Sequence, residues 1–382
     1  MSVYLDYNAS SPIDNRVVDY MVDIYKNTIG NADSRTHDFG DNARVIVENA
    51  RKQVGLLLDI PPKDVFFTSG ATESNNIAIQ GLREYAENTG KKHIITTSIE
   101  HKAVLETAKY MGKHGYRVDY VFPDQTGRIS AEDVIALVND DTLLVSVMHV
   151  NNETGVIQPV KEIGDELADK DVLFHIDATQ SCGKLVEELR EISYDILSFS
   201  SHKMYGPQGI GALVLRRKNY KLPPVKPIMF GGQQEHGISP GTIPVALVGG
   251  FGKACELAAE EYKKDEEDNM DIKDMLTEML KKSGIKYKIN GSVDHCISST
   301  LNIQIEGVSS EALMLTSKEY CSISNGSACT SSSYSPSYVL VAMGMSEDEI
   351  DQSIRLSWGR NTNFEVLRDN FEKLLKVTKE LV

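Results

Sequence analysis

The chain has 382 residues, of which 41% are hydrophobic and 25% charged, and its formal net charge at pH 7 is −15. That length is enough for a large core and is typical of a soluble protein with two domains. The negative charge argues against nucleic acid as a partner, because no basic stripe is available to neutralise phosphates.

Membrane association and export are not expected. No apolar run approaches the roughly 18 residues of a membrane span, and the first residues lack the basic and apolar regions of a signal peptide. The five cysteines are odd in number and form no CxxC pair, so they indicate neither a disulfide framework nor a zinc site. We therefore expect a cytoplasmic protein without a bound metal.

The first half of the chain alternates between helical and strand patterns. Helical spacing predicts helices over residues 42–58, 71–90 (closed by Gly90) and 101–115. Strands are predicted over residues 64–70, 93–98 and 117–122.

Three continuous apolar runs follow, over residues 141–150, 171–177 and 194–200. Such runs are typical of strands buried on both faces of a mostly parallel sheet. Strands that alternate with helices over some two hundred residues predict a doubly wound α/β domain, which we assign to residues 16–262.

The pattern changes near residue 260. Residues 256–284 are rich in charge and predict a long solvent-facing helix or helix pair. A strand over 299–307, a helix over 309–320 and a strand over 353–360 then predict a smaller α+β domain. We assign residues 1–15 and 263–382 to it.

The stretch "TSGATESNN" comes after "DVFF" of the predicted strand and turns directly into a helix. The first N–H groups of a helix have no partner within it and favour an anion, so Ala71 and Thr72 could hold a phosphate. The alternative is an ordinary helix cap formed by Ser69 or Thr72.

Polar side chains follow several of the predicted parallel strands. They are His101, Asn151, Asn152, Asp177, Gln180 and Lys203. Each has a plain explanation by itself, because Lys203 could face water and Asp177 could cap a helix. Ligands of open α/β sheets collect at the carboxyl ends of the strands, so together these residues predict one crevice.

These polar residues are of the types that bind pyridoxal phosphate. Lys203 could form a Schiff base, and Asp177 could keep the ring nitrogen protonated so that the ring acts as an electron sink. His101 could stack on the ring and move protons. Ser200 and His202 could bind phosphate oxygens.

Motifs along the chain carry a resemblance to a known family. They include "YLDYNASSP", "TSGATESNN", "EHKAV", "MHVNNETGVIQP", "HIDATQSCGK", "SFSSHKMYGPQGIGAL", "PGTIP", "SNGSACTSSSYSPSYVL" and "IRLSWGR". Their content and order, from about residue 3 to 365, resemble the cysteine desulfurases of the NifS/IscS type. These enzymes belong to the class V aminotransferase superfamily of fold-type I pyridoxal-phosphate enzymes.

The resemblance implies roles for the cofactor contacts. Lys203 would be the Schiff-base lysine, Asp177 the pyridinium partner, and His101 the stacking acid or base. Asn152 and Gln180 would contact the ring. The phosphate would be held by Ala71, Thr72, Ser200 and His202.

Further roles concern the substrate and a second subunit. Arg355 matches an arginine that grips the substrate carboxylate, for which its planar fork is suited, and Asn31 matches a residue near that carboxylate. Thr242 matches a threonine that reaches the phosphate of the neighbouring subunit, which implies a homodimer. The family usually has "GNPSS" where this chain has "GNADS", and an arginine where it has Ser239.

Cys329 matches the sulfur-accepting nucleophile of the family. Its surroundings, "SNGSACTSSSYSPS", are polar and rich in small residues, which predicts an exposed mobile loop. A long loop of this kind resembles the group of desulfurases that supply iron–sulfur assembly. The other cysteines, Cys182, Cys255, Cys296 and Cys321, are interpreted as structural.

The expected activity is therefore that of a cysteine desulfurase. L-cysteine would become L-alanine, and its sulfur would pass to Cys329 as a persulfide and then to an accepting scaffold or carrier protein. A selenocysteine lyase or an aminotransferase of the same superfamily is the alternative, and an inactive sulfur-transfer scaffold is a third. A nucleophilic cysteine has no use in an aminotransferase.

Overall fold

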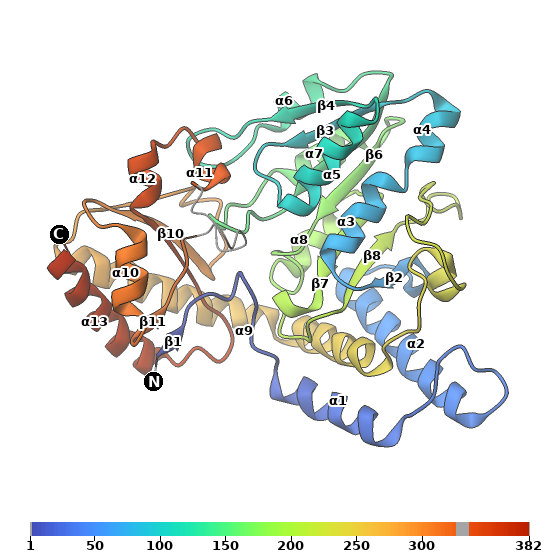
Figure 1. Ribbon diagram of the computed structural model, residues 1–382, viewed down its shortest axis with the longest axis horizontal. Helices are drawn as coiled ribbons and strands as arrows, with labels where there is room; N and C mark the ends of the chain where they lie inside the picture. The colour runs from blue at the N-terminus through green and yellow to red at the C-terminus, as the bar shows by residue number, and fades with distance from the viewer. Residues whose placement is uncertain (1, 326–335, 382) are drawn as a thin grey trace.

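The computed structural model describes residues 2–325 and 336–381. Its strands form a sheet of seven, a sheet of three and a parallel pair (Figure 1). The larger sheet and its helices build one side of the molecule, and the smaller sheet with the C-terminal helices builds the other.

The large sheet is mostly parallel, as predicted. Its strands are β2 (Val65–Thr68), β3 (His93–Thr97), β4 (Arg117–Val121), β5 (Thr142–Met148), β6 (Leu173–Asp177), β7 (Ile196–Ser200) and β8 (Gly211–Leu215). They lie in the order β2-β8-β7-β6-β5-β3-β4. Only β8 pairs antiparallel with its neighbours, β2 and β7.

Helices cover both faces of this sheet. The helices of this part are α1 (Asn15–Asn27), α2 (Asp38–Leu58), α3 (Ala71–Gln80), α4 (Arg83–Thr89), α5 (Lys102–Lys113), α6 (Ala131–Ala136), α7 (Val160–Leu167), α8 (Val186–Glu191) and α9 (Val245–Ser283). Of these, α1 packs mainly on α9 and not on the sheet. The 3-10 turns are η1 (Pro62–Asp64), η2 (Ser201–Lys203) and η3 (Gln234–Gly237).

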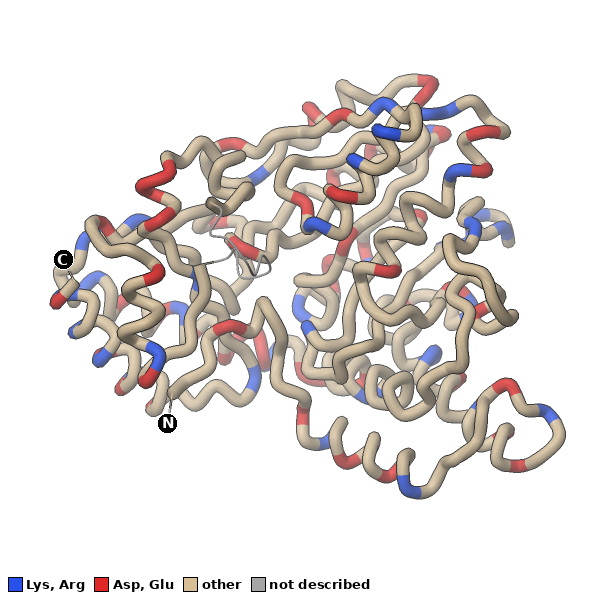
Figure 2. Tube along the Cα trace, in the orientation of Figure 1, with Lys and Arg blue, Asp and Glu red and all other residues tan. Residues whose placement is uncertain are grey.

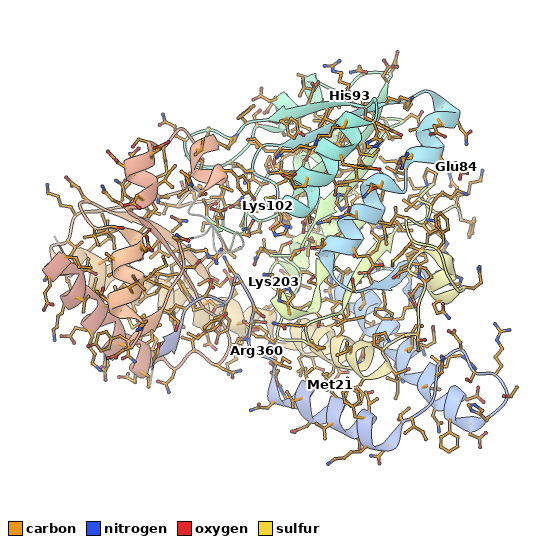
Figure 3. All side chains as sticks on the ribbon, viewed as in Figure 1. Met21, Glu84, His93, Lys102, Lys203 and Arg360 are labelled. Atoms are coloured by element: carbon orange, nitrogen blue, oxygen red, sulfur yellow. The ribbon has the colours of Figure 1, made fainter. Side chains whose placement is uncertain are left out.

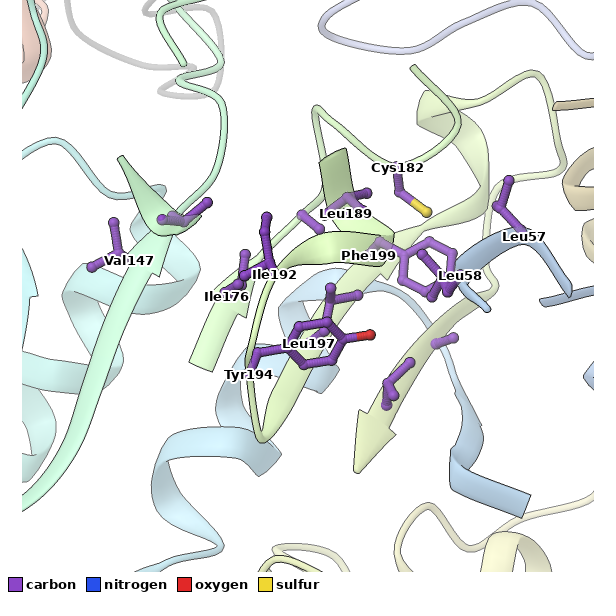
Figure 4. Packing of buried hydrophobic residues seen from close by; sticks show 14 of the residues in the cluster. Leu57, Leu58, Val147, Ile176, Cys182, Leu189, Ile192, Tyr194, Leu197 and Phe199 are labelled. Atoms are coloured by element: carbon purple, nitrogen blue, oxygen red, sulfur yellow. The ribbon is translucent and has the colours of Figure 1, made fainter. Parts of the chain in front are cut away.

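Side chains along each strand point alternately to the two faces of the large sheet, which explains why helices pack on both faces. Phe67 and Val145 face the core that contains α2, α7 and α8, whereas Phe66 and Leu144 face the core under α3, α4 and α5. Because successive strand residues point to opposite faces, a strand buried on both faces must be apolar throughout. Figure 4 shows part of the first core, where Phe199 and Leu197 of β7 pack beside Cys182 and Leu58.

The smaller part of the molecule has its own core. Strands β9 (Tyr287–Ile289), β10 (Thr300–Ile305) and β12 (Ser353–Ser357) are antiparallel, and β1 (Val3–Tyr4) pairs with β11 (Cys321–Ser322). The C-terminal helices are α10 (Ser310–Ser317), α11 (Tyr338–Ala342), α12 (Glu347–Asp351) and α13 (Phe364–Leu381). Helices α10 and α13 pack on this second core, whereas the buried residues of α11 and α12 belong to the first core. Leu5, Leu276, Trp358 and Phe371 are buried together in the second core.

Two predicted helices differ from the observed ones. Residues 71–90 form two helices, because the carbonyl of Gly81 accepts a hydrogen bond from Lys226 N–H at 2.9 Å and leaves the helical pattern there. The predicted helix 256–284 is the second half of α9, which begins at Val245 and connects the two cores. It ends at Gly284, whose φ of 75° suits a glycine cap.

Charges of both signs are interspersed over the molecule (Figure 2). Among the residues that the structure describes, no helix is both long and apolar enough to cross a bilayer.

Candidate active site

A cavity of about 280 Å³ lies at the carboxyl ends of β5, β6 and β7. The structure brings together here all but one of the residues that were predicted at strand ends, the exception being Asn151. The lining includes Ala71, Thr72, His101, Asn152, Asp177, Gln180, Ser200, His202, Lys203 and Arg355. Parallel strands explain this convergence, because their carboxyl ends meet at one edge of the sheet.

Lys203 is the last residue of η2, directly after β7. Its Nζ donates hydrogen bonds to the carbonyl oxygens of Asn8 and Ala9, each at 2.6 Å. Figure 3 shows Lys203 between the two sides of the molecule. The amine therefore lies inside the crevice and not in open solvent. Asn8 and Ala9 also line the cavity, and sequence analysis missed both.

Asp177 ends β6 and is 4% exposed. Its Oδ2 accepts a hydrogen bond from Asn75 Nδ2 at 2.8 Å, and its Oδ1 accepts one from Thr179 N–H at 3.0 Å. The carboxylate is thus fixed from α3 and from the turn after β6. Asn75 was not singled out from the sequence, although it lies in the quoted stretch "TSGATESNN".

The start of α3 is open to an anion. Gly70 is its N-cap, with a φ of 153° and no side-chain capping bond, so neither Ser69 nor Thr72 caps the helix. Ala71 N–H donates to Ser200 Oγ at 2.7 Å, which leaves the Ser200 hydroxyl proton to donate elsewhere. The N–H groups and hydroxyls gathered here suit phosphate oxygens.

Both predicted histidines of the site are held neutral. Burial, and then the nearby Lys203, lower the pKa of His202 to about 4. Burial is the largest cause of the lowered pKa of His101, opposed by Asp177. His101 Nδ1 accepts a hydrogen bond from Ala103 N–H at 3.1 Å, so the neutral ring carries its proton on Nε2.

Arg355 reaches the cavity from β12 of the small sheet. Its Nη2 lies 2.5 Å from Asp6 Oδ1, and its Nη1 donates to the carbonyl of Asn152 at 2.9 Å. Its buried Nε has no partner within the described residues. The guanidinium is therefore fixed in place, and its Nε–H can still donate a hydrogen bond to a ligand.

Three residues named from the sequence do not line this cavity. Asn31 lies on an exposed turn, where its Oδ1 accepts from Asp33 N–H. Asn151 is buried and holds the following turn through Glu153 N–H and Thr154 N–H. Thr242 lines a separate pocket beside Ser69 and Glu73.

Cys329 lies outside the described residues; the segment before it contacts a cavity residue, and the segment after it contacts the neighbour of one. Ser324 forms a β-bridge with Arg355. On the other side, Ser337 Oγ donates to Glu153 Oε2, and Asn152 beside it lines the cavity.

The other cysteines are poor nucleophiles. Cys182, Cys255 and Cys321 are buried, and burial raises the pKa of each thiol, that of Cys321 to about 12. Cys296 is partly buried, and burial raises its pKa as well. Only the thiolate is strongly nucleophilic, so these four remain protonated and inert near neutral pH.

Comparisons with known proteins give the class. The family model for class-V aminotransferases matches residues 3–368. The chain is 41% identical over 378 residues to the cysteine desulfurase IscS of Escherichia coli O139:H28, covering 98% of this chain and 92% of the relative. The chain therefore belongs to the class-V aminotransferase family, and within it to the cysteine desulfurases.

Solved structures agree with this assignment. A NifS-like protein superposes with a TM-score of 0.91 at 34% identity, covering the whole of both chains. DndA from Streptomyces lividans superposes with a TM-score of 0.81 at 41% identity, covering 92% of this chain and 98% of DndA.

The cofactor of this family is pyridoxal phosphate, and the cavity fits it. Besides the amine of Lys203 and the carboxylate of Asp177, the lining offers two buried polar atoms without a partner in the described part of the chain, Asn152 Oδ1 and Thr179 Oγ1. Buried polar atoms normally find partners, so these two indicate room for a polar ligand.

Proposed function

We propose that this cysteine desulfurase converts L-cysteine to L-alanine and stores the sulfur on Cys329 as a persulfide. The observation that carries the proposal is the convergence of Lys203, Asp177, His101 and Arg355 on one cavity. An amine, a carboxylate, a neutral imidazole and a guanidinium are the groups that this chemistry on an amino acid requires.

Each residue would hold one part of the cofactor. Lys203 would bind it covalently, Asp177 would lie at the ring nitrogen, and His101 would cover the ring face. Asn152 and Gln180 would contact ring substituents. The start of α3, with Ser200 and His202, would hold the phosphate. When bound, pyridoxal phosphate supplies an electron sink that stabilises an electron pair released at the substrate carbon.

The chain's own residues would then bind and activate the substrate. Arg355 would bind the carboxylate of L-cysteine, and Asn31 matches a family residue that lies near that carboxylate. The thiolate of Cys329 attacks the substrate sulfur, so that an S–S bond forms as the C–S bond breaks. The β-carbon of the substrate, from which the sulfur has been removed, takes up a proton, and the product L-alanine is released. His101, neutral with its proton on Nε2, is suited to give or take protons in this step.

We further propose that the active form is a homodimer to which Thr242 contributes. Thr242 is exposed, and so are the large apolar residues Met229 and Phe230, of which Phe230 is 87% exposed. Met229 lines the same pocket as Thr242, and exposed apolar residues that adjoin one another favour an interaction surface. Thr242 would reach the phosphate held by the other subunit, in line with its position outside the cavity.

The division into domains 16–262 and 1–15 plus 263–382 is part of the same proposal. The two separate hydrophobic cores support most of this division, with Leu5 packed into the second core. Helices α11 and α12 depart from it, because Val339, Leu340 and Ile350 pack into the first core. We also propose a cytoplasmic location and a protein scaffold or carrier that accepts the sulfur, with iron–sulfur assembly as the process served.

One assay tests the proposed reaction. The protein is loaded with pyridoxal phosphate, given L-cysteine and a thiol reductant, and assayed for alanine and sulfide. We expect both in equal amounts, and we expect Cys329→Ala to produce no sulfide. Alanine without sulfide, or sulfide from the Cys329→Ala variant, would refute the proposal. L-selenocysteine in a parallel sample separates this function from that of a selenocysteine lyase.

A further inference from the structure

The turn that carries Lys203 continues into a strained residue. Tyr205, two residues later, has a φ of 65°, a left-handed conformation that residues with a bulky side chain rarely adopt. Its side chain is buried at 8% exposure. A conformation of this kind persists only where the surrounding structure holds it, and such residues cluster at functional sites.

The N-terminal segment holds the backbone of this turn. Tyr205 N–H donates to Ser11 Oγ at 2.8 Å, and the Tyr205 carbonyl accepts from Asp14 N–H at 3.0 Å. The same segment provides the carbonyls of Asn8 and Ala9 that bind Lys203 Nζ. A shift of Tyr205 against this segment would therefore also shift Lys203.

Arg360 holds the side chain of Tyr205 from the opposite direction. Its guanidinium carbon lies 4.8 Å from the centre of the Tyr205 ring, and its backbone N–H donates to Tyr205 Oη at 2.9 Å. The approach depends on Gly359, because a Cβ there would lie only 2.3 Å from Tyr205 Oη. Figure 3 labels both Arg360 and Lys203 in the middle of the molecule, between its two sides.

Acidic residues from two other segments fix the guanidinium itself. Arg360 Nη2 pairs with Asp265 of α9 at 2.6 Å, and Nη1 pairs with Glu261 of α9 at 2.9 Å and with Asp14 at 3.2 Å. The side chain of Arg360 is 11% exposed. Ion pairs of limited exposure hold their partners more firmly than surface pairs do.

We propose that Arg360 is a positioning residue for the desulfurase reaction: by clamping Tyr205 in its strained conformation, it fixes the turn that places Lys203 Nζ in the cofactor cavity. Arg360 itself does not line that cavity. The inference rests on the proposed role of Lys203 as the residue that binds the cofactor.

The test measures Lys203 directly. Full-length protein is freed of cofactor, mixed with pyridoxal phosphate for increasing times, reduced with borohydride and digested. Mass spectrometry of the Lys203 peptide then gives the rate constant with which Lys203 captures the cofactor. The visible absorbance of the loaded protein, recorded over a pH series, gives the pH midpoint of the bound cofactor's titration. Thermal unfolding is followed separately. Wild-type protein must be labelled at Lys203, and labelling elsewhere would refute the proposed function itself.

Arg360→Met removes the planar cation but keeps a long side chain. We expect capture to slow by about 10-fold or more, with a shifted pH midpoint, because small misplacements of a reacting group cost large factors in rate. The matched control is Arg16→Met, because Arg16 pairs with the same acids, Asp14 and Glu261, and is 47% exposed. We expect it to capture the cofactor within about twofold of wild type.

Tyr205→Phe provides a second variant should Arg360→Met fail to fold. It keeps the ring and loses only the hydroxyl that accepts from Arg360 N–H. We expect a smaller slowing in the same direction. Wild-type capture rates and pH midpoints in both folded variants, whatever their thermal stability, would overturn the inference and leave the proposed function intact.

Discussion

Asn75 Nδ2 donates a hydrogen bond to Asp177 Oδ2 at 2.8 Å, and both side chains are buried. The pair joins α3, whose first residues line the cavity, to the end of β6. A hydrogen bond to a buried carboxylate both orients it and stabilises its charge. Asn75 therefore helps to fix the orientation of the Asp177 carboxylate in the cavity.

The first prediction concerns this bond. Asn75→Leu keeps most of the volume but removes the donor, and we expect turnover of L-cysteine to fall about 10-fold, the value of one hydrogen bond to a charged group. Asn76→Leu, the next residue along α3, is the control and should stay within about twofold of wild type. Equal turnover in Asn75→Leu and wild type would mean that Asp177 needs no support from α3.

The second prediction concerns substrate binding. Arg355→Lys keeps the positive charge but loses the planar fork, so we expect KM for L-cysteine to rise about 10-fold with a smaller change in kcat. Arg368→Lys, on an exposed face of α13, is the control. A change confined to kcat would contradict a carboxylate-binding role for Arg355.

The third prediction concerns pH and stability. Burial raises the pKa of Glu100 to about 8, well above the value of an unfolded chain. The folded state therefore binds a proton that the unfolded state loses, and stability falls as pH rises from about 4.5 to about 8. Glu100→Gln mimics the protonated acid and keeps an oxygen for Thr97 and Met148 N–H.

Denaturant unfolding of the cofactor-free protein at a series of pH values checks this. We expect Glu100→Gln to flatten the decline and to gain about 2 to 4 kcal/mol over wild type at pH 8. Exposed Glu106→Gln should reproduce the wild-type profile. A parallel profile for Glu100→Gln and wild type would show that Glu100 is ionised in the folded protein.

Strand geometry explains which residues of the site could be predicted from the sequence. Lys203, Asp177 and His101 could be found because each follows an apolar run, and parallel strands end at one edge. Asn8 and Ala9 could not be found this way, because they contribute backbone carbonyls from a segment without periodicity. Every residue has a backbone carbonyl, so the residue type does not indicate which carbonyls take part in a site.

Features of the fold that depend on long-range contacts could not be predicted from the sequence either. The mostly parallel sheet was predicted correctly, but nothing local shows that β8 runs antiparallel between β2 and β7. The break between α3 and α4 depends on Lys226, far along the chain. Arg355 could be assigned only through the family resemblance, because β12 belongs to the other core.

The fourth prediction concerns the proposed dimer. Phe230→Asp places a charge next to Met229, which lines the same pocket as Thr242. We expect it to shift the protein to monomers and to lower cofactor retention and turnover together. Light scattering and bound-cofactor absorbance measure both effects. Val293→Asp, at an exposed position of the small domain, should change neither. A fully active Phe230→Asp monomer would refute a role for a second subunit.

The proposed function depends above all on Cys329 as the residue that accepts the sulfur of L-cysteine. Its most direct test is mass spectrometry of the intact protein and its peptides after one equivalent of L-cysteine, without reductant and with a thiol-blocking reagent. We predict one additional sulfur atom on the peptide that contains Cys329, together with one equivalent of L-alanine. An additional sulfur on Cys321 or Cys296, or alanine formed with no sulfur retained on the protein, would contradict the account.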